Sequence, residues 1–218
     1  MESSAAVPRE TEPRPDEVLE PLFPEGLSGI CRFVDLLTSE GVARGLLGPR
    51  EPGRIWTRHI LNCAVVAPLF GVDQEVADVG SGAGLPGVVL ALARPDLRVT
   101  LVEPLLRRTV FLDSLADFLE LSNLEVVRAR AEELHGQRLF DAVTARAVAP
   151  LTRLAGWSLP LLRSGGELVA LKGSGAPEEL AEAADVLRRL GAGDSRIETW
   201  GASVLAVPTT VVRIRSNG

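Results

Sequence analysis

The chemistry of this chain is concentrated in a glycine-rich loop between an apolar strand and an apolar helix. Residues 75–90 read EVADVGSGAGLPGVVL, in which an apolar run ends at Val79 and Gly80, Gly82 and Gly84 follow at alternate positions. Glycine has no Cβ, so the backbone can adopt a positive φ and approach a ligand closely. The helix that follows presents unpaired N–H groups at its N-terminus. The loop therefore predicts a site whose ligand lies directly against the backbone.

Two classes of cofactor fit the spacing of these glycines. The G-x-G-x-x-G dinucleotide fingerprint matches from Gly82 to Gly87, whereas the D-x-G-x-G-x-G loop of S-adenosylmethionine-dependent methyltransferases matches from Asp78 to Gly84. Both need an acidic residue at the end of the next strand, about 20 residues on, to bind ribose hydroxyls. Glu103 ends the next apolar run. We therefore predict a nucleoside-type cofactor, against the alternative of a glycine turn without a ligand.

Other candidate residues follow the later strands, because ligands of such sheets bind beyond the carboxyl ends of the strands. Glu132, after Ala131, accepts a bond from an adenine amino group or is a solvated acid at a helix start. Arg146 binds a carboxylate or phosphate in a bidentate manner, or forms a structural ion pair. Lys172 contacts a phosphate or is an exposed charge at a strand end. Spacing alone leaves these alternatives open.

Several classes of protein are excluded. The sequence shows no Ser/His/Asp set, cysteine nucleophile or metal-binding cluster. His59 is one of two histidines, and a single histidine on a helix is more often structural than catalytic. Cys31 and Cys63 form no disulfide framework, which predicts a reduced, cytoplasmic setting. The first 21 residues lack the apolar centre of a signal peptide, and no apolar run approaches the length of a membrane span. We therefore expect no membrane association.

The net charge of −6 is unevenly distributed. Residues 1–25 carry seven acids and two bases, so the remainder is close to neutral and can present a basic face to a nucleic acid. The composition predicts a disordered acidic tail over residues 1–21, a helical cap over 22–72 and a cofactor-binding core over 73–218.

Strands and helices alternate after the glycine loop. Apolar periodicity predicts helices over 26–38, 55–70, 85–93, 105–120, 150–162 and 177–190, and strands over 76–79, 98–103, 124–128, 140–145, 167–171, 196–200 and 210–215. Repeated strand–helix units indicate an α/β fold with a doubly wound, mostly parallel sheet, and the last two strands are expected to form an antiparallel pair.

Together, these motifs resemble those of the bacterial small-subunit ribosomal RNA guanine-N7 methyltransferases, also called glucose-inhibited division protein B. The resemblance covers about residues 22–215, although 39–49 lacks that family's W-N-x-x-x-N-L-T segment. The matching motifs are R-H-I-L at 58–61, D-V-G-S-G-A-G-L-P-G at 78–87, R-R-x-x-F-L at 107–112, R-A-E at 130–132, R-A at 146–147 and L-K-G at 171–173.

The resemblance implies a class I methyltransferase (Rossmann-like) fold and methyl transfer from S-adenosylmethionine to N7 of a guanosine in small-subunit (16S) rRNA. It implies cofactor binding by Gly80, Leu85, Ala131, Glu132 and Arg146, to which the spacing argument adds Asp78, Gly82, Gly84 and Glu103. The basic residues Arg58, Arg107, Arg108 and Lys172, with His59, form the candidate RNA-binding surface. The expected partner is small-subunit rRNA or the ribosomal subunit, and the expected state is a monomer.

Guanine N7 carries a lone pair and no proton at neutral pH, so such an enzyme needs no general base. Arg146 is then expected to position a substrate group. No metal ion is expected. Two other functions remain open at this point. An NAD-dependent oxidoreductase would use Gly82, Gly84, Gly87 and Glu103, but the chain has no Tyr for a Tyr-x-x-x-Lys set. A non-catalytic domain that binds S-adenosylmethionine or RNA is the other alternative.

Overall fold

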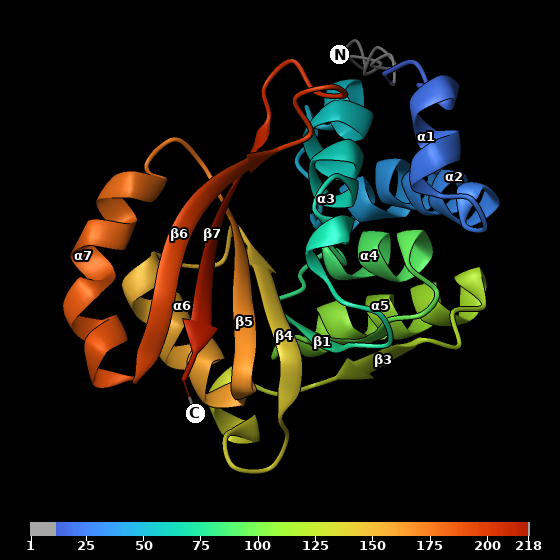
Figure 1. Ribbon diagram of the computed structural model, residues 1–218. Helices are drawn as coiled ribbons and strands as arrows, with labels where there is room; N and C mark the ends of the chain where they lie inside the picture. Colours follow the sequence, from blue (N-terminus) through green and yellow to red (C-terminus); the bar gives the residue numbers. More distant parts are fainter. Residues whose placement is uncertain (1–11, 218) are drawn as a thin grey trace, which may run out of the picture.

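The computed structural model describes residues 12–217 and consists of a seven-stranded sheet with helices on both faces (Figure 1). The strands are β1 (Glu75–Val79), β2 (Arg98–Val102), β3 (Leu124–Val127), β4 (Phe140–Arg146), β5 (Leu162–Lys172), β6 (Ala192–Trp200) and β7 (Thr209–Ser216). The helices are α1 (Asp16–Leu22), α2 (Leu27–Leu36), α3 (Asn62–Ala64), α4 (Gly87–Ala93), α5 (Leu106–Leu119), α6 (Leu151–Ser158) and α7 (Ala176–Arg189).

The strand order is β3-β2-β1-β4-β5-β7-β6. β1 to β5 pair in parallel, and β7 pairs antiparallel with both β5 and β6. In this register Asp78 of β1 lies opposite Leu101 of β2 and Thr144 of β4. The carboxyl ends of β1, β2 and β4 therefore meet at one edge, where a doubly wound sheet binds its ligand. The predicted fold, including the antiparallel C-terminal strands, is confirmed.

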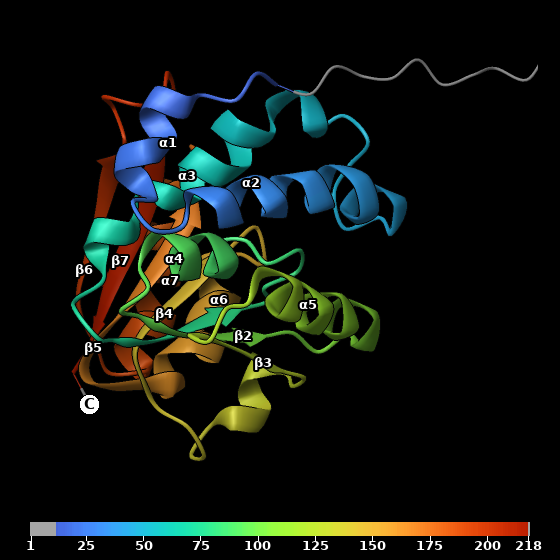
Figure 2. The same ribbon diagram turned by 90° about the vertical axis from the view of Figure 1, so that its right-hand side faces the viewer.

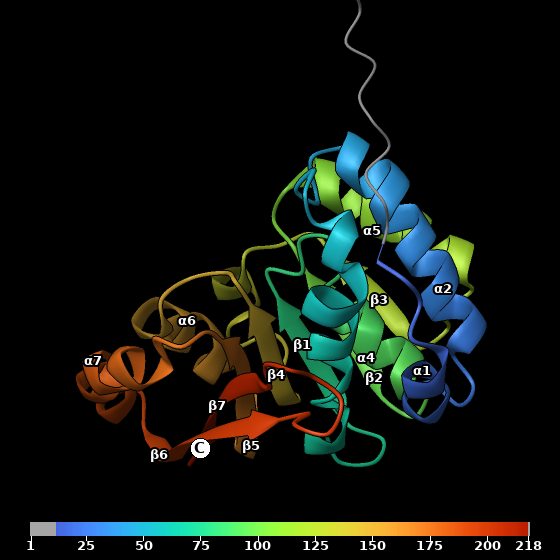
Figure 3. The ribbon, with the colours of Figure 1, turned by 90° about the horizontal axis from the view of Figure 1, so that it is seen from above.

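Helices cover the two faces of the sheet in separate groups. Seen along the sheet in Figure 3, α6 and α7 lie on one side and α1 to α5 on the other. Side chains alternate between the two cores: Val169 and Leu171 of β5 join the cluster under α2 and α4, whereas Leu168 and Ala170 join the cluster under α6 and α7. Central parallel strands are buried on both faces for this reason.

The N-terminal region is more ordered than its composition predicts. The expected disordered tail spans residues 1–21, but residues 16–22 form α1, and Leu19 is fully buried. Figure 2 shows α1 lying beside α2 and α3. The prediction is wrong for this part of the tail, because one apolar stripe allows a short acidic segment to pack. Residues 1–11 lie outside the described residues.

The predicted helix over 55–70 is divided into three pieces. A π-helical turn, Trp56–Leu61, is followed by α3 and a 3₁₀ turn, Ala67–Leu69. Glu12, from the segment before α1, accepts hydrogen bonds from the backbone N–H groups of Trp56 (2.8 Å) and Thr57 (3.0 Å). π-Helical turns are frequent at functional sites. In this chain the π-helical turn carries two of the predicted site residues.

No helix of residues 12–217 combines the length and apolar character that a bilayer crossing requires.

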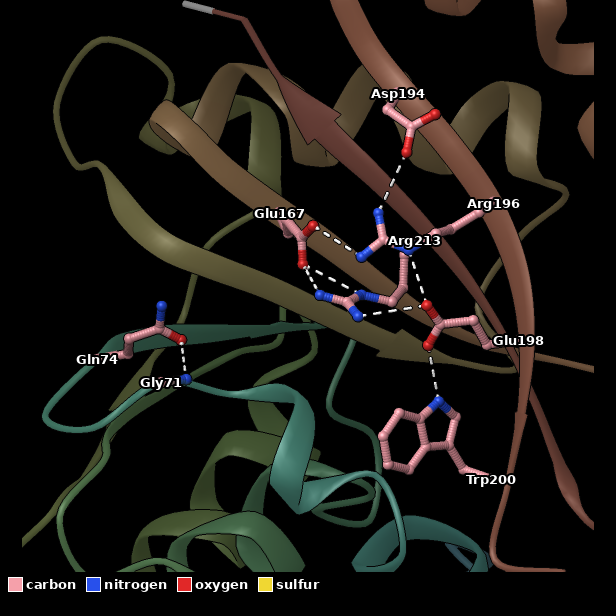
Figure 4. Close-up of polar contacts among 8 residues, drawn as sticks. All are labelled: Gly71, Gln74, Glu167, Asp194, Arg196, Glu198, Trp200 and Arg213. Carbon is pink, nitrogen blue, oxygen red and sulfur yellow. Dashed lines mark hydrogen bonds and ion pairs between the residues drawn. The ribbon is translucent and has the colours of Figure 1, made fainter.

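A lattice of ion pairs lies on one face of β5, β6 and β7, where no helix of the described chain covers this half of the sheet (Figures 1 and 4). Glu167 of β5 contacts Arg213 of β7 and Arg196 of β6, and Glu198 of β6 contacts both arginines. Trp200 donates its indole N–H to Glu198 (2.8 Å). Arg213 pairs with both glutamates, and only 16% of its side chain is exposed. On this part of the sheet, charged side chains therefore cover the strands where a helix would otherwise pack.

Replacing Arg213 tests the contribution of this lattice. We expect Arg213→Gln to lower the free energy of unfolding by about 1–2 kcal/mol, because two half-buried carboxylates each lose a partner. The control is Arg188→Gln on α7, whose pair with Asp185 is 75% and 74% exposed and should contribute less than about 0.5 kcal/mol. Urea denaturation at low and high salt measures both variants, and equal losses would show that the lattice adds nothing beyond surface pairs.

Candidate functional site

The glycine loop after β1 has the backbone that its sequence predicts. Gly80, Gly82 and Gly84 have φ values of +74°, +58° and +93°. A Cβ on Gly80 would lie 2.9 Å from the side chain of Val148, so the loop can approach the end of β4 only with glycine there. The loop is therefore shaped by its neighbours as well as by its own conformation.

Asp78 fixes this loop to the start of α4. Its Oδ2 accepts the backbone N–H of Gly87 at 2.9 Å, and the side chain is fully buried. Burial raises the pKa of Asp78 to about 7, against the hydrogen bond from Gly87, which lowers it. The Oδ1 atom is buried without a hydrogen-bond partner among the described residues. Asp78 is therefore a positioning residue with one polar atom left over.

Glu103 directly follows β2 and lies beside the loop, at the position where the sequence predicts an acid. It is 1% exposed, and its carboxylate accepts the backbone N–H groups of Gly82 (3.1 Å) and Leu105 (3.0 Å). Arg108 of α5 also contacts this carboxylate, at 3.3 Å. A buried carboxylate held by two backbone donors keeps a fixed position from which it can accept ligand hydroxyls.

A cavity of about 810 Å³ opens beside Glu103 and the glycine loop. Of the predicted cofactor-binding residues, Gly80, Glu103, Ala131 and Glu132 line this larger cavity. The volume lies in the range of about 300–1,000 Å³ that is usual for small-molecule sites. The larger cavity and its buried acid fit a nucleoside cofactor.

Other predicted cofactor residues support the cavity without lining it. Asp78, Gly82, Gly84 and Leu85 lie in the loop or behind it, and Arg146 lines a neighbouring cavity instead. Trp157 of α6 also lines the larger cavity and was not among the predicted site residues. No motif marked this residue, since only the packing of α6 places it there.

The neighbouring cavity, of about 610 Å³, collects most of the predicted RNA-binding residues. Arg58, His59 and Lys172 line this smaller cavity together with Arg146 and Asn62. The two cavities share Ala147 and Val148, which follow β4 and form the wall between them. Ala147 has a φ of +55°, an uncommon value for a residue other than glycine.

The guanidinium of Arg146 is anchored in the smaller cavity. Its Nη1 donates to the carbonyl of Arg58 (3.1 Å) and approaches Oδ1 of Asn62 at 3.5 Å, and its Nη2 lies 2.6 Å from Nδ1 of His59. Nε2 of His59 lies 2.7 Å from Glu51, in the loop before the π-helical turn. Glu51 and Asn62 were not among the predicted site residues, because no spacing pattern connects them to Arg146.

Lys172 points inward, where its ammonium group is paired. Its Nζ donates to the carbonyl of Ala149 (2.8 Å) and to Glu179 of α7 (2.7 Å), and 9% of its side chain is exposed. Glu179 also accepts the backbone N–H of Leu151 at 2.8 Å. Burial would raise the pKa of Glu179, but the hydrogen bonds from Lys172 and Leu151 hold this pKa below its usual value. Lys172 therefore fastens the segment that begins α6.

The remaining two predicted RNA-binding residues lie away from the smaller cavity. Arg108 lines the larger cavity through its contact with Glu103, and Arg107 is exposed on α5 and lines neither cavity. The structure thus divides the predicted basic surface into three places. Within residues 12–217 no group of His, Cys, Asp and Glu side chains could hold a metal ion.

Comparison with known proteins connects this geometry to a family. Residues 27–205, which contain both cavities, match the family model for rRNA small subunit methyltransferase G, GidB. The ribosomal RNA small subunit methyltransferase G of Nocardioides sp. (strain ATCC BAA-499 / JS614) is 53% identical over 208 residues, 95% of this chain and 83% of its own. That of Thermobifida fusca (strain YX) is 54% identical over 200 residues, 92% of this chain and 84% of its own.

Solved structures add the fold. The ribosomal protein L11 methylase from Lactobacillus delbrueckii subsp. bulgaricus matches with a TM-score of 0.54 over 72% of this chain and 77% of its own, at 14% identity. That likeness supports a Rossmann-like methyltransferase fold and nothing finer. The predicted family is confirmed by the family model and the relatives, and with it an S-adenosylmethionine-dependent rRNA methyltransferase activity. The chain therefore belongs to the rRNA small subunit methyltransferase G family.

Proposed function

We propose that S-adenosylmethionine binds in the larger cavity, that a guanosine of small-subunit rRNA enters the smaller cavity, and that the methyl group passes to its N7 atom. The observation that carries this proposal is the shared wall of Ala147 and Val148, which places the two cavities side by side. Glutamates and arginines both line the larger cavity, whereas Arg58, Arg146 and Lys172 line the smaller one together with Glu179.

The larger cavity suits each part of the cofactor. Glu103 would accept the ribose hydroxyls, and Ala131 with Glu132 would hold the adenine, in agreement with the motif order. Asp78 is fully buried behind the glycine loop and lines neither cavity, so its carboxyl group would act on the amino group of the cofactor by charge across the loop and without direct contact. A cationic group there also lowers the cost of keeping Asp78 ionised, because an opposite charge favours the charged form of a carboxyl group.

The smaller cavity suits an anionic partner. Arg58 is 58% exposed at its rim, where its Nε lies 3.4 Å from Glu51, and it would contact a phosphate from this position, whereas Arg146 is anchored inside. Arg107, exposed on α5, would extend the contact along the RNA. Phosphate contacts of this kind position RNA without reading its sequence.

S-adenosylmethionine, when bound, supplies an electrophilic methyl group. Guanine N7 has a lone pair and no proton, so the chain has to position the base and exclude water, with no proton to remove. Positioning of two reactants contributes about 7–11 kcal/mol to such a step. Arg146 carries a guanidinium, which only donates hydrogen bonds, and therefore positions a substrate group without accepting a proton. We also infer a cytoplasmic protein, since its two cysteines are unbridged.

Replacing Glu103 tests the cofactor assignment. We expect Glu103→Gln to weaken S-adenosylmethionine binding by about 1–3 kcal/mol, because hydrogen bonds to a charged acceptor are lost. Glu178→Gln, at an exposed position of α7 outside both cavities, is the matched control. Titration calorimetry with S-adenosylmethionine and with NAD measures both variants. Equal affinity of Glu103→Gln and the control would place the cofactor elsewhere, and NAD binding would favour an oxidoreductase.

Replacing Asp78 separates stability from cofactor binding. A carboxyl group whose pKa rises on folding, here to about 7, binds its proton more tightly in the folded chain. Its cost to stability therefore grows as the pH rises from about 4 to about 7. We expect Asp78→Asn to raise the free energy of unfolding by about 1–4 kcal/mol at pH 8, with a smaller effect at pH 5, and to weaken S-adenosylmethionine binding. Urea denaturation at both pH values checks the first part, and a loss of stability that is equal at both would contradict it.

The absence of a general base predicts a flat pH profile. With RNA and S-adenosylmethionine both saturating, the single-turnover rate should change little between about pH 6.5 and pH 8.5, whereas a general-base enzyme loses activity as its base protonates. Rapid-quench methylation of small ribosomal subunits measures this rate. A tenfold fall per pH unit already between pH 8.5 and about pH 6.5 that disappears in one His, Asp or Glu variant would show that a base participates.

A further inference from the structure

Some N–H donors of the Arg146 guanidinium contact the protein, and the others remain available to a substrate. A guanidinium carries five N–H donors. Three of these donors are directed at the carbonyl of Arg58, at Asn62 and at His59. Thr209 of β7 in turn orients Asn62, since Nδ2 of Asn62 donates to its hydroxyl oxygen at 2.7 Å. The Nε–H and one N–H of Nη2 are left without an acceptor in the described chain, so they are available to a substrate.

The contact between Arg146 and His59 determines the tautomer of the imidazole. Arginine can only donate, so Nδ1 of His59, 2.6 Å from Nη2, must carry a lone pair. The proton of the neutral ring is then on Nε2, which donates to the carboxylate of Glu51 at 2.7 Å. Both ring nitrogens are occupied, and His59 is 8% exposed, so the ring has no lone pair to offer a substrate proton.

We propose that His59 is a positioning residue for methyl transfer: as the Nε2–H tautomer, it links Glu51 to Arg146 and holds the guanidinium in place for the target guanosine. This inference rests on the proposed function only in naming the guanosine. The link itself follows from the two contacts of the imidazole. His59 acts through Arg146 and does not touch the reacting atoms.

The charges around His59 keep the link intact at neutral pH. Arg146 of β4 faces Nδ1, Glu51 faces Nε2, and Arg58 lies beside it in the same π-helical turn. Burial first, and then the charge of Arg146, lower the pKa of His59, although the hydrogen bond to Glu51 opposes them. Arg54 also pairs with Glu51, at 2.7 Å.

Acidification would break this link in a defined way. A proton added at Nδ1 would face the N–H of Arg146. The hydrogen bond would then become a contact between two hydrogen-bond donors, each of which is positively charged. The guanidinium would then move away from His59. Because the pKa of His59 is lowered, we expect this loss only below the ordinary histidine value of about 6.5.

Nitrogen NMR of the full chain tests the tautomer directly, without reference to activity. In ¹⁵N-labelled protein at pH 7, long-range ¹H–¹⁵N spectra should show His59 with a bare Nδ1 and a protonated Nε2. The second histidine, His135, provides the internal comparison, and a His59→Asn sample assigns the signals. An Nδ1–H tautomer, or an imidazolium at pH 7, would overturn the inference whatever the substrate is.

Kinetics test the positioning role. His59→Leu removes the acceptor, and we expect the saturated single-turnover rate to fall tenfold to a hundredfold, roughly the loss that a misplaced group causes. The affinity for S-adenosylmethionine should stay within twofold, since His59 does not line the larger cavity. His59→Asn places an amide oxygen near the position of Nδ1, so it should recover most of the rate and lose the fall at acidic pH.

The outcomes separate the two proposals. If the wild-type chain methylates guanosine N7 and the rate of His59→Leu is unchanged, the positioning role is wrong. If His59→Asn keeps the acid-side fall, His59 is not the titrating group and the link is wrong. If the wild-type chain methylates no guanosine in small-subunit rRNA while the NMR tautomer is found, the proposed function fails and the link stands. A His59→Leu chain that does not fold leaves the NMR spectra and the pH profile of His59→Asn as the deciding measurements.

Discussion

One buried hydrogen bond organises the site: the contact of Asp78 with the backbone N–H of Gly87. It joins the end of β1 to the start of α4 and so closes the glycine loop between them. The junction is tight, because a Cβ on Gly87 would lie 2.3 Å from Leu101 and 2.8 Å from Asp78. A carboxylate in such a place is unfavourable by itself. The conformation of the loop, the position of Glu103 beside it and the shape of the larger cavity all depend on the buried carboxylate of Asp78 and its hydrogen bond from Gly87.

The sequence predicted best where one local rule decides the structure. Strands β1 to β5 follow from apolar runs, and Gly80 and Glu103 from the fixed offset between a glycine loop and the acid after the next strand. Residues 16–21 were misassigned, because the prediction weighed the acidic composition of this segment and not the burial of Leu19. The π-helical turn after Ile55 was also missed, since helical periodicity over 55–70 does not distinguish a π turn from an α-helix.

Side-chain partners were the least predictable part of the site. Lys172 was expected at the RNA surface and is paired inside with Glu179, and Arg108 contacts Glu103 in the larger cavity. Both pairings join residues whose meeting depends on how α5 and α7 pack against the sheet. Glu51 comes to His59 from a loop without any pattern of its own. A charged residue in a sequence identifies the chemistry available, whereas its partner depends on tertiary packing.

The position of β7 has a consequence for how the chain folds while it is being synthesised. β7 follows β6 in sequence but lies between β5 and β6, and it pairs with both. A ribosome therefore produces β5 and β6 before the strand that joins them, and the edge of β5 stays open during that interval. Open edges invite pairing with other chains. The charge of Glu167 at this edge disfavours pairing of β5 with another chain until β7 forms and Arg213 pairs with Glu167.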